Sequence, residues 1–595
     1  MQAEAEESDE IAGIIPKPPG TREFTFRAVI AGMVVAAVMG ASYPYIVLKL
    51  GFGPNVSVVA AFFGYLSLGL IFRNFNRWEN NIVQTAGTSA AQTAFMCVIL
   101  AAFDLLRQNT SLGYTFSPTP FQSFLWLSVA SVLGLLLAVP LRRHYVVDEK
   151  LKYADGFAAA QTIVVLDGRG PEARYPAALL AVGVVVSGLV FFFQTPWGGH
   201  GIPEIIAPTM FGLALAGAGA GLSTGVLSIG SGMIVGLRVT VSMAIGAVLS
   251  WVIAPHILVD LGIVPHTLVD GAIAVKRNDV LRWVMWPGTA MIICAGLTSL
   301  ALKWQTLART FKDLSTGPEN EEEFPLRWVM IGVVVSTVLL VLVQIWIFQL
   351  PWWAPVVSVM LSLPLMLVGL RVLGETNWGP ISQLTNLMQV AFAALLPASI
   401  TANLATSGTT GTIATQSEAI MQDYKAGHLI GSKPRYLTYA QLMAAPIGAA
   451  AVAWMYPLLR DTYGIGGDGL SSPISVRVAN FAQFLTQGES AMGQYATGAA
   501  IVFAVLGIAM AVLEGTPWRK YVPSPTAVGI GMVVPGFVVF SMVLGGVVQW
   551  LWEKRNKQVA TRYSAPLASG LIAGEAIVAV VIPLLIAIGV LSANG

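Results

Sequence analysis

The chain has 595 residues, of which 33 are Lys or Arg and 31 are Asp or Glu, so its formal net charge is +2. Charged residues make up 11% of the chain and hydrophobic residues 55%, with a mean hydropathy of +0.71. Because soluble domains carry about 25% charged residues, a soluble multidomain protein is excluded. A net charge this small does not attract nucleic acid electrostatically. Two cysteines and five histidines are too few for a redox or metal cluster. We expect an all-α integral membrane protein without a cofactor.

The first residues are acidic and polar, unlike the basic start of a cleaved signal peptide. Residues 1–24 are predicted to form a disordered cytosolic tail. Arg22 and Arg27 flank the first apolar stretch, as positive charges do on the cytoplasmic side. The sequence therefore predicts a multipass protein of the inner (plasma) membrane with a cytoplasmic N-terminus.

Apolar stretches long enough to cross a bilayer recur along the whole chain. A spanning helix needs about 20 mostly apolar residues, and on this criterion we expect about 14 to 16 transmembrane helices. The clear candidates are 26–50, 54–72, 82–105, 121–140, 176–194, 207–228, 232–257, 283–303, 328–349, 352–373, 436–459, 493–513, 524–551 and 566–592. Two further stretches, 154–166 and 381–404, are interrupted by polar residues and are predicted to be re-entrant or half-length helices near a substrate site.

The two halves of the sequence resemble each other at an offset of about 300 residues. Residues 230–251 align without gaps on residues 529–550 with ten identities in 22 positions, where about two or three are expected by chance. Residues 27–38 match 327–338, and 54–58 match 355–359, at nearly the same offset. We therefore predict a first membrane repeat over 25–304, a polar linker over 305–326 and a second repeat over 327–595. Two repeats around a midplane site are a recurring plan of transporters.

One polar strip lies within an expected span of the first repeat. Gln84, Thr88 and Gln92 are spaced by four residues, so they share one face of a helix. Lipid would penalise this face, so we expect it to line a wet cavity and to bind substrate.

A second polar region follows residue 374 in the second repeat. Its dense Thr, Ser and Gly residues are typical of an unwound segment that coordinates a polar solute, although an ordinary exposed loop is the alternative. The substrate-binding residues predicted here are Asn386, Gln389, Asn403, Thr406, Ser407, Thr409, Thr410 and Gln416.

Ionisable residues within or beside the spans are functional candidates, because an unpaired charge is costly in the membrane. Glu375, Glu418, Glu575 and Asp155 are the candidates for proton coupling. Arg238 is a further candidate that could instead pair with an acid, and Glu514 has the surroundings of an interfacial residue.

Three strings of the sequence resemble the oligopeptide transporter family, which includes the yellow-stripe-like metal-chelate transporters. They are residues 421–435, beginning Met-Gln-Asp-Tyr and ending Pro-Arg, residues 79–85 and residues 569–575. The resemblance runs from about residue 24 to the end of the chain and is closer to the prokaryotic and yellow-stripe-like branch. It implies about sixteen spans from a duplicated unit and uptake coupled to protons.

Small peptides or peptide-like metal chelates, such as siderophore or iron complexes, are the substrates that this resemblance implies. We therefore expect a secondary active transporter that uses protons as the coupling ion and has lipid, but no nucleic acid, as a partner; a homodimer stays open. A passive polar-solute channel is the main alternative, because it would also need polar strips. An integral-membrane enzyme is disfavoured, because the sequence shows no catalytic motif such as His-Glu-x-x-His or Gly-x-Ser-x-Gly.

Overall fold

The computed structural model describes residues 17–18, 20–50, 56–71, 75–109, 112–151, 153–167, 171–199, 201–207, 209–210, 213–269, 272–302, 322–376, 379–466, 470–488, 493–587 and 590–591. Most of the predicted tail 1–24 and of the predicted linker 305–326 lies outside these residues. Ten helices of the described part are long and apolar enough to cross a membrane. The chain is therefore an all-α, multipass membrane protein.

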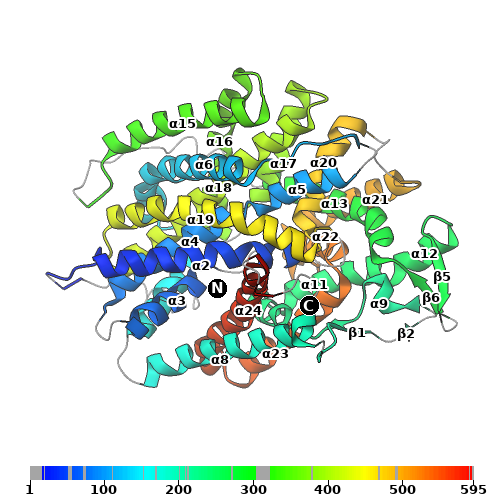
Figure 1. Ribbon diagram of the computed structural model, residues 1–595, viewed down its shortest axis with the longest axis horizontal. Helices are drawn as coiled ribbons and strands as arrows, with labels where there is room; N and C mark the ends of the chain where they lie inside the picture. The colour runs from blue at the N-terminus through cyan, green and yellow to red at the C-terminus, as the bar shows by residue number, and fades with distance from the viewer. Residues whose placement is uncertain are drawn as a thin grey trace.

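The helices pack in two groups. The first group comprises α2 (Phe26–Leu50), α3 (Val56–Ile71), α4 (Arg77–Ala94), α5 (Cys97–Gln108), α6 (Pro120–Ala138), α7 (Ala154–Asp167), α15 (Leu326–Phe348), α16 (Trp353–Thr376), α17 (Ile381–Leu395), α18 (Ile400–Ile430), α19 (Pro434–Tyr463) and α20 (Pro473–Gln487). In Figure 1, α15, α6, α19 and α2 of this group run side by side, and each packs on the next.

The second group comprises α8 (Pro171–Gln194), α9 (Leu215–Ala218), α10 (Val226–Val235), α11 (Leu237–Val248), α12 (Ala254–Asp260), α13 (Arg277–Leu302), α21 (Ala496–Glu514), α22 (Pro525–Val533), α23 (Gly536–Arg555) and α24 (Lys557–Ala587). Short 3-10 or π-helical turns continue or join the helices of both groups, at Val139–Leu141, Arg143–Asp148, Pro196–Gly198, Leu249–Ile253 and Pro517–Lys520. Each group draws on both halves of the sequence, so segments about 300 residues apart lie in the same group.

Small β-structure lies beside the second group, near α9 and α12 in Figure 1. Strands β1 (Ile205–Ile206) and β4 (Leu222–Ser223) pair antiparallel, and a second sheet has the order β2 (Thr209–Met210), β3 (Leu213–Ala214), β6 (Ala272–Val275) and β5 (His266–Val269). The predicted span 207–228 is therefore wrong. Gly219 and Gly221 have φ values of +94° and +139°, which a helix does not contain.

Helix α18 is the buried centre of the first group, and it is continuous. The prediction of an unwound segment around residues 403–412 is wrong, because the hydroxyl groups of this stretch bond to carbonyl oxygens of their own helix. Thr406, Thr409 and Thr410 each donate to the carbonyl four residues earlier, at 2.8, 2.9 and 3.1 Å. Its glycines admit close neighbours, since a Cβ at Gly408 would lie 2.7 Å from the Trp126 ring.

Two other helices are broken where the sequence predicts continuous spans. Helix α10 ends before Gly236, whose φ is +87°, and α11 begins directly after it. Helix α22 ends at Val533, and α23 begins after Pro535. In the alignment of residues 230–251 on 529–550, Gly236 stands opposite Pro535, so the two breaks fall at the same position of the repeat.

Contacts between these broken helices are reciprocal. A Cβ added at Gly232 would overlap the carbonyl oxygen of Met542, and one added at Gly531 would overlap the carbonyl oxygen of Met243. Gly232 aligns with Gly531, and Met243 aligns with Met542, so each contact is the counterpart of the other. Isologous packing around a twofold axis has this property.

Substituting Gly531 by alanine is expected to lower stability by about 1–3 kcal/mol or more, because the atom in the way is rigid backbone. The apparent melting temperature in detergent measures the effect. Gly498→Ala is the matched control, since nothing lies within 4 Å of an added Cβ there. Equal melting temperatures for the two variants would contradict the packing described here.

Helices α15 and α21 carry exposed apolar surface along their length. Val334 and Leu342 on α15, and Ile501 and Val505 on α21, have between 58% and 59% of their surface exposed. Exposed apolar side chains along a whole helix are stable in hydrocarbon and not in water.

Candidate functional site

A cavity of about 290 Å³ lies where the two helix groups meet. The first group contributes lining residues from α2, α3, α4, α7, α16, α17, α18 and α20, and the second group contributes α13 and α22. The volume is close to the lower end of the roughly 300–1,000 Å³ that small-molecule sites occupy.

The two helix groups differ in the charge that they bring to the cavity, although both contribute apolar side chains. Its ionisable residues Glu418, Asp155 and Arg477 all belong to the first group. The second group contributes Thr526 and the apolar side chains Ile292, Ile530 and Val533. A polar ligand would therefore be held by the first group and covered by the second.

Two ionisable side chains, one acidic and one basic, line the cavity without a partner among the described residues. Glu418 on α18 is 7% exposed, and its Oε1 atom accepts no hydrogen bond there. Arg477 on α20 is 4% exposed, and its Nε atom likewise has no hydrogen-bond acceptor. Buried charges are normally paired, so both groups are available for a ligand.

A chain of hydrogen bonds leads from the cavity to a deeper carboxylate. Thr88, which lines the cavity, accepts a hydrogen bond of 3.0 Å from Gln84 Nε2. Gln84 Nε2 also donates to Oδ1 of Asp423 at 2.6 Å, and Gln441 Nε2 donates to Oδ2 at 2.5 Å. The Asp423 side chain is completely buried, and no cation lies within 4.0 Å of it among the described residues. Two amides thus hold a carboxylate that lacks a counter-charge.

The structure brings some of the predicted site residues to the cavity. Thr88 and Gln92 of the first polar strip line it, as do Asp155 and Glu418. Gln84 is one hydrogen bond away through Thr88.

Other predicted residues bond to one another within the helix packing. Gln389 and Asn403 form a pair, because Asn403 Nδ2 donates to the Gln389 carbonyl at 2.7 Å and Gln389 Nε2 donates to Asn403 Oδ1 at 3.0 Å. Gln416 donates to the Ser89 carbonyl at 2.9 Å. Thr409 accepts from Trp126 and Gln344, and Thr410 bonds to Ser362. None of these residues lines the cavity; neither do Thr406, Ser407 and Asn386, although Asn386 Oδ1 is buried without a described partner.

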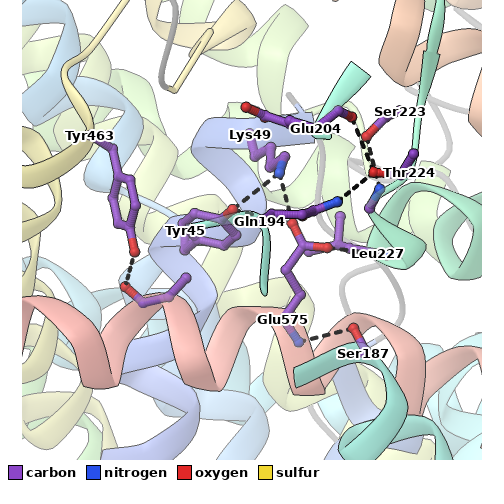
Figure 2. A network of polar contacts seen from close by, with 12 residues as sticks. Tyr45, Lys49, Ser187, Gln194, Glu204, Ser223, Thr224, Leu227, Tyr463 and Glu575 are labelled. Atoms are coloured by element: carbon purple, nitrogen blue, oxygen red, sulfur yellow. Dashed lines mark hydrogen bonds and ion pairs between the residues drawn. The ribbon is translucent and has the colours of Figure 1, made fainter. Parts of the chain in front are cut away.

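The remaining proton-coupling candidates are Glu375 and Glu575. The side chain of Glu375, near the end of α16, lies outside the described residues. Glu575 on α24 is paired with Lys49 at the end of α2, with 2.7 Å between Oε1 and Nζ, and the two side chains point toward each other in Figure 2. Tyr45 donates to Glu575 Oε1 at 3.2 Å, and the backbone N–H of Leu227 donates to Oε2 at 3.3 Å. Glu575 therefore joins α2, α24 and the start of α10.

Arg477 and Asp423 are the two functional candidates that the sequence reasoning missed. Arg477 lies on a short helix between two counted spans, where no apolar stretch drew attention to it. A signal for it was an arginine in an otherwise apolar and amide-rich stretch, Ile-Ser-Val-Arg-Val-Ala-Asn-Phe. Asp423 stands inside the Met-Gln-Asp string, which served only as a mark of resemblance.

The described residues contain no group of three His, Cys, Asp or Glu side chains that could hold a metal ion. Arg238 bonds to the Arg519 carbonyl at 2.9 Å and lies 3.4 Å from Glu514, with its side chain 45% exposed. This pair lies at the surface, away from the cavity.

Comparison with known proteins agrees with this picture. The family model described as OPT oligopeptide transporter protein matches residues 23–586. The metal-nicotianamine transporter YSL2 of Arabidopsis thaliana is 25% identical, over 96% of this chain and 94% of its own length. The iron-phytosiderophore transporter yellow stripe 1 of Zea mays is also 25% identical, over 93% of this chain and 89% of its own. The chain belongs to the OPT oligopeptide transporter family.

Proposed function

We propose that this protein takes up small peptides or peptide-like metal chelates across the membrane, driven by protons. Membership of the oligopeptide transporter family supports transport, and the names of the two relatives support metal chelates as substrates. Protons are the proposed coupling ion. A catalytic function has no support from these relatives, which are named as transporters.

One observation connects the proposal with this cavity: among the described residues, Glu418 and Arg477 each have a buried polar atom without a hydrogen-bond partner. Peptides and amino-carboxylate chelates bear positive and negative groups on one small molecule. Glu418 and Arg477 line the same cavity of about 290 Å³ and would neutralise such a pair of groups. Thr88 and Gln92 would add hydrogen bonds from the other repeat.

Proton coupling is assigned within this proposal to carboxylates at or near the cavity. Glu418 and Asp155 line it, and Asp423 is linked to it through Gln84 and Thr88. Glu575 is a weaker candidate, because Lys49 already compensates its charge. Glu375 stays a candidate from the sequence alone.

The two proposed repeats, 25–304 and 327–595, are supported by the reciprocal contacts of Gly232 and Gly531. They are also supported by the matched helix breaks at Gly236 and Pro535. We further propose a plasma-membrane location with a cytoplasmic N-terminus, for which Arg22 and Arg27 beside the first span are the support. A homodimer in lipid stays part of the proposal, without an interface assigned to it.

Uptake into proteoliposomes tests the function directly. With an inward proton gradient, radiolabelled di- to tetrapeptides or chelated iron should accumulate, saturate with concentration and lose accumulation when a protonophore is added. Uptake that does not saturate and ignores the protonophore would indicate a passive channel. No uptake of either substrate class, beside a working control symporter, would overturn the proposal.

A further inference from the structure

Three short helices begin at the cavity with N-terminal residues that no side chain caps. They are α17 after Pro380, α20 after Ser472 and α22 after Ser524. Residues of their first turns, Ile381, Ile474 and Thr526, line the cavity. The first N–H groups of a helix have no partner within the helix and carry partial positive charge, so they favour an anion.

Arg477 adds a full positive charge at the same place. It follows the first turn of α20, lines the cavity and is 96% buried. Its Nε atom has no acceptor, and no carboxylate lies within 4.0 Å of its guanidinium, among the described residues. A buried arginine without an anionic partner raises the free energy of a membrane protein. An anion bound from outside the chain would neutralise its charge and lower that free energy.

The other repeat shows how such a helix start is filled. The first turn of α10 holds a carboxylate, because the Leu227 N–H donates to Glu575 Oε2 while Lys49 pairs with Oε1. When the alignment of 230–251 on 529–550 is extended by three residues toward the N-terminus, Leu227 stands opposite Thr526. At α10 the carboxylate and the cation both belong to the protein, whereas at α22 the first turn faces the cavity and the cation there is Arg477.

We propose that the cavity binds a carboxylate of the transported molecule, held by the Arg477 guanidinium and by the first-turn amides of α20 and α22. The start of α17 is not part of this site, because a Cβ added at Gly379, directly before this helix, would overlap the Glu418 carboxylate. This inference rests on the proposed function, since it states which group of the substrate the site requires. The substrate is then an acid: a peptide with a free C-terminus, or a metal chelate that keeps a carboxylate away from the metal. Glu418, in the same cavity, faces the positive part of the substrate.

The test compares matched probes with and without the carboxylate. Trialanine and trialanine amide form the peptide arm, and ferric citrate and a neutral ferric hydroxamate complex form the chelate arm. Each is measured as uptake and as a competitor in proteoliposomes containing wild-type protein, Arg477→Lys or Arg477→Met. Arg282→Met, at a side chain that is 80% exposed, is the surface control.

For wild type, the probe with the carboxylate in at least one arm should have an apparent affinity about 10- to 100-fold higher than its counterpart without the carboxylate. Arg477→Met should abolish this preference, Arg477→Lys should keep part of it, and Arg282→Met should keep all of it. Without substrate, Arg477→Met should melt at a higher temperature than wild type, because an unpaired buried charge is gone. A merely structural arginine would instead lower the melting temperature and leave the preference unchanged.

Equal uptake of the probes with and without the carboxylate would overturn the carboxylate site and leave the proposed function standing. Uptake of none of the four probes would overturn the proposed function, and this inference with it. A preference for acids that persists in Arg477→Met would remove Arg477 from the site.

Discussion

Replacing Asp423 by asparagine is expected to abolish proton-driven accumulation of substrate while leaving substrate exchange across the membrane intact. Asp423 is completely buried between Gln84 and Gln441, with no described cation beside it. Because no cation neutralises it, this carboxylate can lose its charge only by taking up a proton. Asparagine keeps the shape but cannot take up a proton, so substrate could still cross without a coupled proton.

The fold should tolerate this substitution. The Oε1 atoms of Gln84 and Gln441 have no described partner, so either amide can rotate and accept from the new NH2 group. Accumulation under an inward proton gradient and counterflow without a gradient are the two measurements, made over a range of external pH. Wild-type accumulation should rise as the external pH falls, and that of Asp423→Asn should be low and flat.

Asp104→Asn is the matched control for burial. Asp104 is also buried, but it is paired with Arg107 and Arg460 and lies outside the cavity lining. Its variant should keep the pH dependence per folded molecule even where it loses stability. Proton-driven accumulation that survives in Asp423→Asn would transfer the coupling role to Glu418 or Asp155, for which Glu418→Gln is the next variant.

Breaking the ion pair of Lys49 and Glu575 is expected to cost about 3–5 kcal/mol of stability, because each single substitution leaves one buried charge alone. The side chains of Lys49 and Glu575 are 9% and 1% exposed. Lys49→Met and Glu575→Gln should therefore both lower the apparent melting temperature sharply. The double variant removes both charges and should recover most of the loss.

Melting of the two single variants and the double variant forms a cycle that isolates the pairwise contribution. Losses that simply add in the double variant would show that the pair is not the cause. The same proteins separate a structural role from a coupling role: if Glu575→Gln folds and its uptake no longer depends on pH, Glu575 moves protons.

The sequence predicts the class of the fold well, because hydrophobic length is a property of composition. It predicts span limits less well where glycine or proline interrupts an apolar run. Residues 524–551 are apolar enough for one span, yet Pro535 separates α22 from α23. Hydropathy does not record backbone conformation, so the break between α22 and α23 could not be found from it, whereas the polar interruptions of 154–166 and 381–404 could.

The sequence predicts site residues correctly where polar side chains recur on one face of an expected membrane span. Thr88 and Gln92 satisfy this condition and do line the cavity. The Thr- and Gly-rich composition around residue 408 led to the wrong prediction of an unwound segment. Threonine hydroxyls that bond to carbonyls of their own helix need no water, and a glycine at this position lets the Trp126 ring pack against the helix. Arg477 was not predictable from spans, since its importance depends on which helices meet around it.

The occupied first turn of α10 limits the number of substrate molecules that one chain can bind. Leu227 and Thr526 stand opposite each other at the same offset, and each lies in the first turn of a helix; Glu575 fills the start at Leu227, whereas the start at Thr526 faces the cavity. Each chain then has room for one substrate molecule per transport cycle. Equilibrium binding should accordingly saturate at one molecule per chain, in spite of the two aligned helix starts.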